Sequence, residues 1–329
     1  MIPGLAAALA AFALSSVGCW TFARWMRRRR LGQPIREEGP AHHQEKAGTP
    51  TMGGLVFLAV WSASAGLLSL WIPFGKEDAF ILVAGLTMAA IGALDDLLKL
   101  VRRDSRGLTG WQKIGLTAGA GVGLFFAYRA AIPLVLRVPF AASEVALPVA
   151  ALAALAVVVF LAATNAVNFT DGLDGLAAGI VILILLGFLA LGGGNPARLL
   201  ALVGALCGYL WTNAHPAGLM MGDAGSFGLG GVLAAVALSR GTAFVFPILA
   251  GVPVLEVLAV ILQVASLRLV GRRLFRMSPL HHHFEASPGA AARPHLLPAC
   301  AWPESKVVVR FWLAQAAFVA LAVLAANVL

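Results

Sequence analysis

The chain has 329 residues, of which 60% are hydrophobic and only 12% are charged, and its mean hydropathy is +0.88. A soluble core requires far less apolar sequence, so the composition excludes a soluble globular domain and indicates a polytopic membrane protein. The net charge of +9 would favour a nucleic-acid partner in a soluble protein, but here we attribute it to membrane topology and expect no nucleic acid.

The apolar runs predict an all-α fold, because backbone groups that face lipid need hydrogen-bond partners within their own segment and no run alternates as a strand does. We expect one transmembrane domain over residues 1–329 with about ten membrane-spanning helices. In chain order, the predicted spans are 2–25, 52–72, 79–98, 113–132, 146–165, 175–191, 198–213, 225–240, 242–267 and 307–328. Pro247 and Pro253 are expected to kink the ninth span.

Lysine and arginine residues gather on alternate connections between the spans. The positive-inside rule therefore predicts that both termini lie outside the cytoplasm. The expected cytoplasmic segments are 26–51, 99–112, 166–174, 214–224 and 268–306.

Five aspartates are expected at the cytoplasmic ends of the third, fifth and seventh spans, namely Asp95, Asp96, Asp171, Asp174 and Asp223. A carboxylate at mid-bilayer costs about 2.5–3.5 kcal/mol on insertion scales, so their accumulation at one face indicates a shared purpose. The alternative is that they are ordinary interfacial residues. We expect almost no polar cluster at the outer ends of the same spans.

In GALDDLLKL, Asp95 and Lys99 are four residues apart on a helix and are expected to form an ion pair. Asp96 points about 100° away around the helix. The spacing therefore predicts one neutralised carboxylate beside one that stays available.

The segment TNAVNFTDGLDGLAAG places Asn168, Asp171 and Asp174 at a spacing of three, which is one face if the segment is helical. Gly172 and Gly175 favour local unwinding instead. The spacing and the closing glutamate of a calcium loop are missing, so an EF-hand is excluded and a magnesium–phosphate site is favoured. In MMGDAGSFGLGG, Asp223 is the natural magnesium ligand, with Asn168 as a possible neutral partner.

The stretch MSPLHHHFE holds His281, His282 and His283. Three adjacent imidazoles cannot easily face one ion, so we expect hydrogen-bonding roles here and no zinc site. His215 and His295 show no constellation and are predicted to be incidental. Glu256 lies within the ninth span and is predicted to be a structural residue, although its partner cannot be read from the sequence.

The stretches GPAHHQEKAGTPTMGG, DDLLK, NFTDGLDGLA, MGDAGS and SPLHHHFE occur in this order on the predicted connections. Together they resemble the phospho-N-acetylmuramoyl-pentapeptide transferase family of bacterial cell-wall synthesis, from about Arg28 to Phe311. The resemblance implies transfer of phospho-N-acetylmuramoyl-pentapeptide from UDP-MurNAc-pentapeptide to undecaprenyl phosphate, giving lipid I and UMP. It also implies Mg²⁺, a ten-span homodimer in membrane lipid, and a site that faces the cytoplasm from the bacterial inner membrane, with periplasmic termini.

The resemblance also assigns roles to individual residues. The implied catalytic residues are Asp95, Asp96, Asp223 and His281. The implied substrate-binding residues are Lys46, Lys99, Lys113, Asn168, Asp171, Asp174, Asn213, Gln263, His282 and His283. His281, His282 and His283 are expected to donate hydrogen bonds to sugar, peptide-side or phosphate oxygens of the donor substrate. The expected metal ligands are Asp223 and Asn168, and Asp95 or Asp96 is expected to deprotonate the lipid phosphate or to form a phosphorylated intermediate.

Two departures from the family pattern stand out. Met220 occupies a position near the uracil where the family usually has phenylalanine, and residues 286–301 form an Ala/Pro-rich insertion. Two other functions stay open at this stage. One is a sister enzyme that transfers N-acetylglucosamine-1-phosphate from UDP-GlcNAc, which TPTMGG and the histidine segment disfavour. The other is a secondary transporter, for which charged groups are expected near the bilayer midplane.

Overall fold

The computed structural model describes residues 2–29, 48–102, 107–285 and 294–326, and this part of the chain is mainly helical. The α-helices are α1 (Ile2–Arg28), α2 (Gly53–Leu68), α3 (Lys76–Arg102), α4 (Gly110–Ala127), α5 (Val149–Thr170), α6 (Leu176–Ala190), α7 (Pro196–Asn213), α8 (Gly222–Ser239), α9 (Phe246–Leu249), α10 (Gly251–Leu269), α11 (His281–Phe284) and α12 (Glu304–Ala326). A 3₁₀ turn, η2 (Arg129–Ala131), and a small antiparallel hairpin of β1 (Val135–Arg137) and β2 (Glu144–Ala146) join α4 to α5. The helical prediction is confirmed, with this hairpin as the one addition in the described residues.

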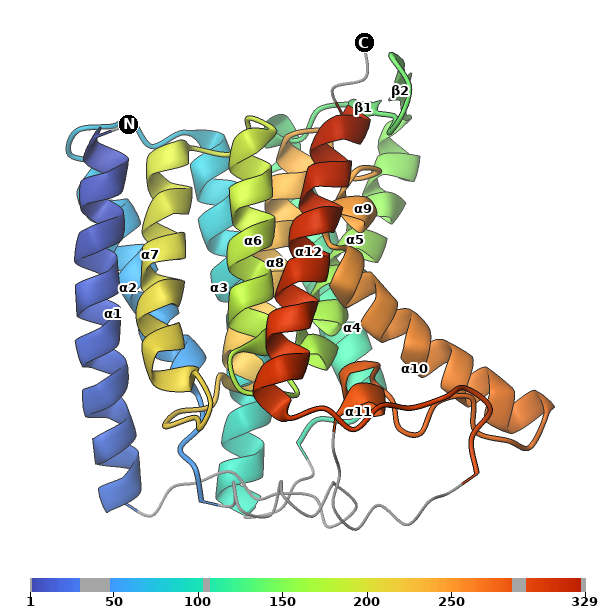
Figure 1. Ribbon diagram of the computed structural model, residues 1–329. Helices are drawn as coiled ribbons and strands as arrows, with labels where there is room; N and C mark the ends of the chain where they lie inside the picture. The colour runs from blue at the N-terminus through green and yellow to red at the C-terminus, as the bar shows by residue number, and fades with distance from the viewer. Residues whose placement is uncertain (1, 30–47, 103–106, 286–293, 327–329) are drawn as a thin grey trace.

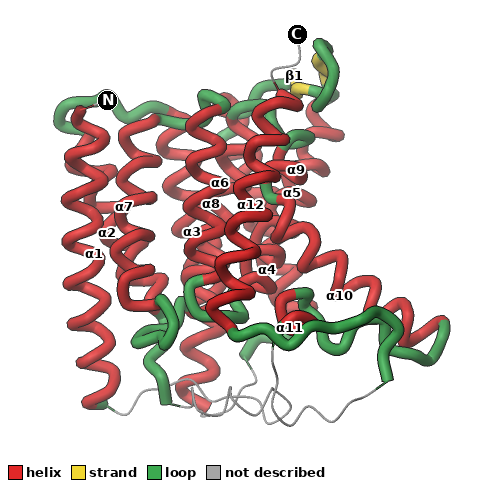
Figure 2. Tube along the Cα trace, viewed as in Figure 1, coloured by secondary structure: helices red, strands yellow, loops and turns green. Residues whose placement is uncertain are grey.

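The long helices stand side by side in one bundle, and α8 runs through its middle (Figure 1, Figure 2). Almost every residue of α8 is buried, including its glycines. Small residues allow the α3 and α8 backbones to approach closely: a Cβ built on Gly92 of α3 would lie 2.0 Å from the Asp223 carbonyl oxygen. This contact brings the end of α3 against the start of α8.

Within the described residues, six helices are long and apolar enough to cross a membrane: α1, α3, α5, α8, α10 and α12. Each predicted span overlaps a helix of the structure. The boundaries differ, because α5 continues to Thr170 and α8 begins at Gly222. Asn168 and Asp223, which were expected in connections, therefore lie within helices.

The ninth predicted span is divided at Ala250 into α9 and α10, and α10 leans away from the bundle (Figure 1). Pro253 has no N–H to donate to the carbonyl of Leu249, the residue four positions before it. Gln315 of α12 donates to that carbonyl at 2.6 Å and accepts from Val252 N–H at 3.2 Å. The expected kink is thus a break whose exposed backbone groups are satisfied by another helix.

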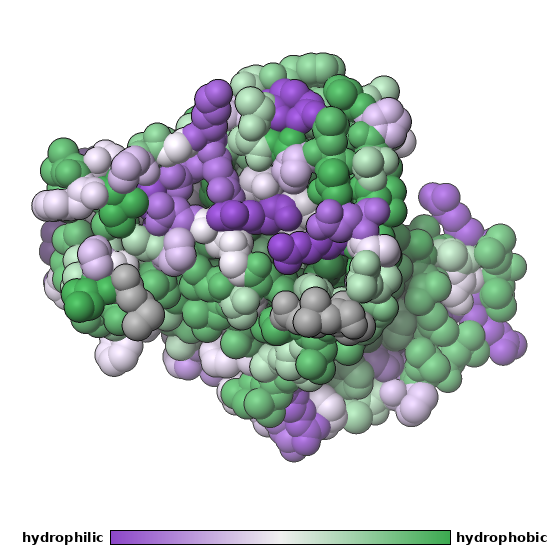
Figure 3. Space-filling view, turned by 90° about the horizontal axis from the view of Figure 1, so that it is seen from above, coloured by the Kyte–Doolittle hydropathy of each residue, from purple (hydrophilic) through white to green (hydrophobic). Residues whose placement is uncertain are grey.

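Purple polar side chains gather in parts of the bundle end that carries Ile2 and Ala326, among mostly apolar green ones, as Figure 3 shows from above. Arg198 forms an ion pair with Asp78 at 2.9 Å, and Arg240 pairs with Glu77 at 2.8 Å. Arg198 is buried. The expectation that this end holds almost no polar cluster was wrong, because these pairs join residues more than a hundred positions apart in sequence.

Candidate functional site

Asp95 and Asp96 at the end of α3 and Asp223 at the start of α8 form one carboxylate cluster. Each contributes a carboxylate oxygen, and these oxygens lie within 4.8 Å of one another. Asp95 and Asp96 are 1% and 2% exposed. Gly222, with φ of +76°, precedes Asp223 in a left-handed conformation that suits glycine, so the backbone turns into α8 at the cluster.

Asp96 caps α8. Its two carboxylate oxygens accept hydrogen bonds from the backbone N–H groups of Asp223 at 3.1 Å and Ala224 at 3.0 Å. A carboxylate at a helix N-terminus satisfies otherwise unpaired donors and interacts favourably with the helix dipole. The expectation that Asp96 stays available beside a neutralised Asp95 was therefore wrong, since the partners of Asp96 come from a distant helix.

Two lysines lie against the carboxylates. The predicted Asp95–Lys99 pair is confirmed, with Oδ2 and Nζ 2.6 Å apart. Lys113 of α4 is 2.5 Å from an Asp223 oxygen and 3.1 Å from Asp95 Oδ2. Asp95 Oδ1 accepts from Leu108 N–H at 2.5 Å and so holds the connection that leads into α4.

Asn168 orients Asp223. Its Nδ2 donates to Asp223 Oδ1 at 3.0 Å and to the Ser226 hydroxyl at 2.9 Å. The amide contacts Asp223 through its nitrogen, so in this arrangement Asn168 does not present its oxygen to the carboxylate cluster.

The donor chemistry of the cluster fits Mg²⁺. The three carboxylates supply hard oxygen ligands of the kind this ion takes in proteins. Lys99 and Lys113 offset only part of their formal charge. A divalent cation together with substrate phosphate would balance the remainder.

The acidic turn between α5 and α6, residues 171–175, is unwound as its glycines predict. Asp171 caps the C-terminus of α5, and Gly175 has φ of +78°. Asp174 Oδ2 accepts a hydrogen bond from Ala217 N–H at 3.0 Å. His215 Nδ1 lies 3.1 Å from the same oxygen and 3.4 Å from Glu304 Oε2. The prediction that His215 is incidental was wrong.

Two predicted substrate-binding amides are engaged within the protein. Asn213 accepts from Gly175 N–H at 3.0 Å and donates to the Leu219 carbonyl at 2.9 Å. Gln263 accepts from Phe275 N–H at 2.8 Å and donates to the Phe275 carbonyl at 3.2 Å. Each amide thereby fixes a connection at the lower end of the bundle in Figure 1.

The three consecutive histidines are buried and already have partners. His282 Nδ1 lies 2.8 Å from Glu285 Oε2. His283 Nδ1 accepts from Arg276 N–H at 3.1 Å, and its Nε2 donates to the Pro298 carbonyl at 3.1 Å. Burial lowers the pKa of the His283 imidazole, which suits a neutral ring in this arrangement.

The partner of Glu256 is His281, whose Nδ1 lies 3.1 Å from Glu256 Oε1. Glu256 was expected to have a structural partner, and the 25 residues between it and His281 explain why the sequence does not reveal that partner. Lys46 and the first part of the insertion, residues 286–293, lie outside the described residues.

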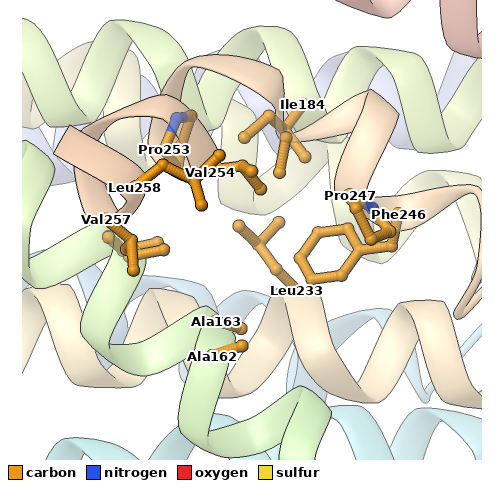
Figure 4. A pocket seen from close by; sticks show the side chains of 13 residues that line it. Ala162, Ala163, Ile184, Leu233, Phe246, Pro247, Pro253, Val254, Val257 and Leu258 are labelled. Atoms are coloured by element: carbon orange, nitrogen blue, oxygen red, sulfur yellow. The ribbon is translucent and has the colours of Figure 1, made fainter. Parts of the chain in front are cut away.

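An apolar cavity of about 180 Å³ lies between α5, α6, α8, α9 and α10 (Figure 4). Ala163, Ala166 and Val167 of α5 line one side of it, and Phe246 and Val257 line others. Asn168 follows Val167 directly on α5. The cavity therefore adjoins the helical turn that reaches the carboxylate cluster.

Comparison with known proteins identifies relatives along nearly the whole chain. Residues 79–241 match the family model of glycosyl transferase family 4, and residues 46–58 match phospho-N-acetylmuramoyl-pentapeptide-transferase signature 1. The phospho-N-acetylmuramoyl-pentapeptide-transferase of Heliobacterium modesticaldum is 40% identical over 91% of this chain and 90% of its own length. The corresponding protein of Moorella thermoacetica is 43% identical over 88% and 87%, and that of Rubrobacter xylanophilus is 38% identical over 96% and 94%.

Proposed function

Because the chain belongs to the phospho-N-acetylmuramoyl-pentapeptide transferase family, we propose that it transfers phospho-N-acetylmuramoyl-pentapeptide from UDP-MurNAc-pentapeptide to undecaprenyl phosphate, forming lipid I and UMP. The observation that carries this proposal is identity of about 40% across nine-tenths of the chain. The cluster of Asp95, Asp96 and Asp223 beside two lysines supplies a place for phosphoryl transfer, which depends mainly on positioning and charge stabilisation.

The proposed topology has ten spans in the bacterial inner membrane, with periplasmic termini and a cytoplasmic site, all within one domain over residues 1–329. Ile2 and Ala326 lie at the same end of the bundle, which supports an even number of crossings (Figure 1). The carboxylates lie at the other end, where α1 and α3 finish in arginines. Positive charge at that end favours the cytoplasmic side.

We assign Mg²⁺ to Asp223, with Asn168 orienting the carboxylate. When bound, the ion would polarise the pyrophosphate of the donor and neutralise charge on departing UMP. Lys99 and Lys113 stabilise negative charge at the same place, because both ammonium groups contact Asp223. Among the substrate-binding assignments, Asp171 and Asp174 lie on the neighbouring turn and Asn213 fixes its end.

The surroundings of the paired aspartates suggest different roles for them. Asp96 uses both oxygens to cap α8, so we assign it to positioning Asp223. Asp95 is bonded to backbone only through Oδ1, while Oδ2 faces the lysines. We therefore assign to Asp95 the removal of the proton from the lipid phosphate, or the nucleophilic attack of a two-step route.

The apolar cavity beside α5 is assigned to a segment of the isoprenoid chain of the lipid acceptor. Its lining side chains are apolar and it adjoins the turn that carries Asn168. A homodimer in the membrane is proposed from the family resemblance, and molar-mass measurement of the detergent-solubilised protein would test it.

The decisive experiment uses purified protein and undecaprenyl phosphate. UDP-MurNAc-pentapeptide and UDP-GlcNAc are supplied in parallel, and Mg²⁺-dependent UMP release is measured. We expect release only with UDP-MurNAc-pentapeptide. UMP release only with UDP-GlcNAc would favour the sister enzyme. UMP release with neither donor would favour the transporter. Isolation of a phospho-sugar adduct on Asp95 would establish the two-step route.

A further inference from the structure

A fully buried carboxylate–imidazole pair connects α10 to the histidine segment. Glu256 and His281 are both 0% exposed. Glu256 Oε1 lies 3.1 Å from His281 Nδ1, and the same carboxylate accepts from the backbone N–H groups of His281 and Leu280. One glutamate thus fixes both the backbone and the ring of His281.

This contact determines which ring nitrogen carries hydrogen. Because Glu256 already acts as the acceptor for two backbone N–H groups, we assign Nδ1–H of His281 as the donor in this pair. In the neutral imidazole, Nε2 is then an acceptor with a free lone pair. The pair resembles in its geometry the outer-shell carboxylates that set the orientation of functional histidines elsewhere.

His281 Nε2 has no hydrogen-bond partner in the described structure, although it is buried. Most buried polar atoms in proteins are paired, so an unpaired one needs an explanation. Nε2 points at the acidic turn: a Cβ built on Gly172 would lie 2.1 Å from it. The neighbouring histidines differ, because His282 contacts Glu285 and His283 uses both nitrogens within the protein.

The Gly172 turn is held at its ends. Asp171 N–H donates to Val167, Asp174 N–H donates to Glu304 at 2.7 Å, and Gly175 N–H donates to Asn213. Gly172 itself places no side chain over Nε2. For a ligand bound at the turn to reach the buried nitrogen, the backbone of Gly172 must move away from it.

We propose that Glu256 is a positioning residue that keeps the Nδ1 hydrogen of His281 occupied, so that Nε2 accepts a hydrogen bond from a hydroxyl or amide N–H group of the donor substrate at the Gly172 turn. The inference rests on the proposed function, because it requires a donor rich in hydroxyl and amide groups. Glu256 does not touch substrate and acts through the ring.

A double-mutant cycle in the UMP assay tests whether Glu256 acts through His281. We expect Glu256→Gln to lower kcat/KM for UDP-MurNAc-pentapeptide at least about tenfold and His281→Ala to lower it about a hundredfold. The double variant should match His281→Ala within about twofold, since Glu256 has nothing left to position. Glu77→Gln, which alters a carboxylate at the opposite end of the bundle, is the matched control and should leave activity unchanged.

The proposal would be overturned if Glu256→Gln lowered kcat/KM as much in the His281→Ala background as in the wild-type protein. That result would show that Glu256 acts through the backbone of the segment and not through the His281 ring. A wild-type protein that releases no UMP would instead refute the proposed function itself. Full wild-type activity with no effect of Glu256→Gln would refute only this inference.

A second pair of variants tests which nitrogen meets the substrate. The amide of His281→Gln reaches the position of Nε2, whereas that of His281→Asn reaches the position of Nδ1. We expect the glutamine variant to keep several-fold more activity than the asparagine variant, with the difference in kcat/KM for the donor exceeding that for the lipid. Equal activity, or greater activity in the asparagine variant, would overturn the proposal.

Discussion

The carboxylate of Asp96 accepts a hydrogen bond from the backbone N–H of Asp223 at 3.1 Å, so Asp96 fixes the backbone of Asp223. Its second oxygen accepts from Ala224 N–H. The end of α3 and the start of α8 are thereby fixed together at the carboxylate cluster. The three aspartates differ in surroundings, and substitutions at them should therefore have different effects.

Asp95→Asn and Asp96→Asn should both lower turnover by more than about 10²-fold. Asp96→Asn should also lower the free energy of unfolding by about 0.5–2 kcal/mol, the usual range for a helix N-cap, because an amide replaces one acceptor with a donor. UMP release and thermal unfolding in the same detergent measure the two effects. Near-normal UMP release from both variants would refute both assignments. Equal losses of stability in the two variants would contradict the capping role assigned to Asp96 alone.

Asp223→Asn should abolish the dependence of activity on Mg²⁺ or abolish activity, because the amide is a poor replacement for a charged oxygen ligand. The wild-type protein should lose activity in a chelator and recover it when Mg²⁺ is added back. Titration of both proteins with Mg²⁺ gives the comparison. An unchanged titration midpoint in Asp223→Asn would exclude this residue as the ligand.

Gly92→Ala should destabilise the protein and lower turnover, because the new methyl group would meet the Asp223 carbonyl at 2.0 Å and the two backbones would have to separate. Gly119→Ala is the control, since no atom lies within 4 Å of a Cβ built there. Alanine is favoured over glycine in a helix by about 1 kcal/mol, so the control should be neutral or stabilising. Equal unfolding temperatures for the two variants would contradict the close contact.

Ala166→Phe should fill the apolar cavity and raise KM for undecaprenyl phosphate severalfold, while KM for the nucleotide-sugar donor stays within about twofold. Val158→Phe adds a phenyl ring at an exposed position of the same helix and serves as the matched control. Initial rates at varied lipid concentration measure the effect. A change confined to the donor KM would place the lipid elsewhere.

Much of the helix order can be predicted from the sequence, because the apolar runs and the Pro, Gly and charged residues that separate them are local features. The pairing of Asp95 with Lys99 is also local, being one helical turn apart. The cap that Asp96 provides and the contact between His215 and Glu304 depend on helices distant in the chain, which periodicity does not report. The break at Ala250 could be predicted only in part. Pro253 indicates that the Leu249 carbonyl loses its helical hydrogen bond, but the hydrogen bond from Gln315 that replaces it depends on the packing of α12 in the bundle.

Ile2 and Ala326 lie at the face of the bundle opposite the carboxylates (Figure 1). Asp95 lies 19 residues along α3 from its start at Lys76, which corresponds to about 28 Å at the standard helical rise. An affinity tag, a fluorescent reporter or a surface tether attached beside Ile2 or Ala326 would therefore lie most of the bundle length away from the reacting groups. Immobilisation through the termini should leave the nucleotide-sugar side open to solution, which makes surface-based ligand measurements practicable on this enzyme.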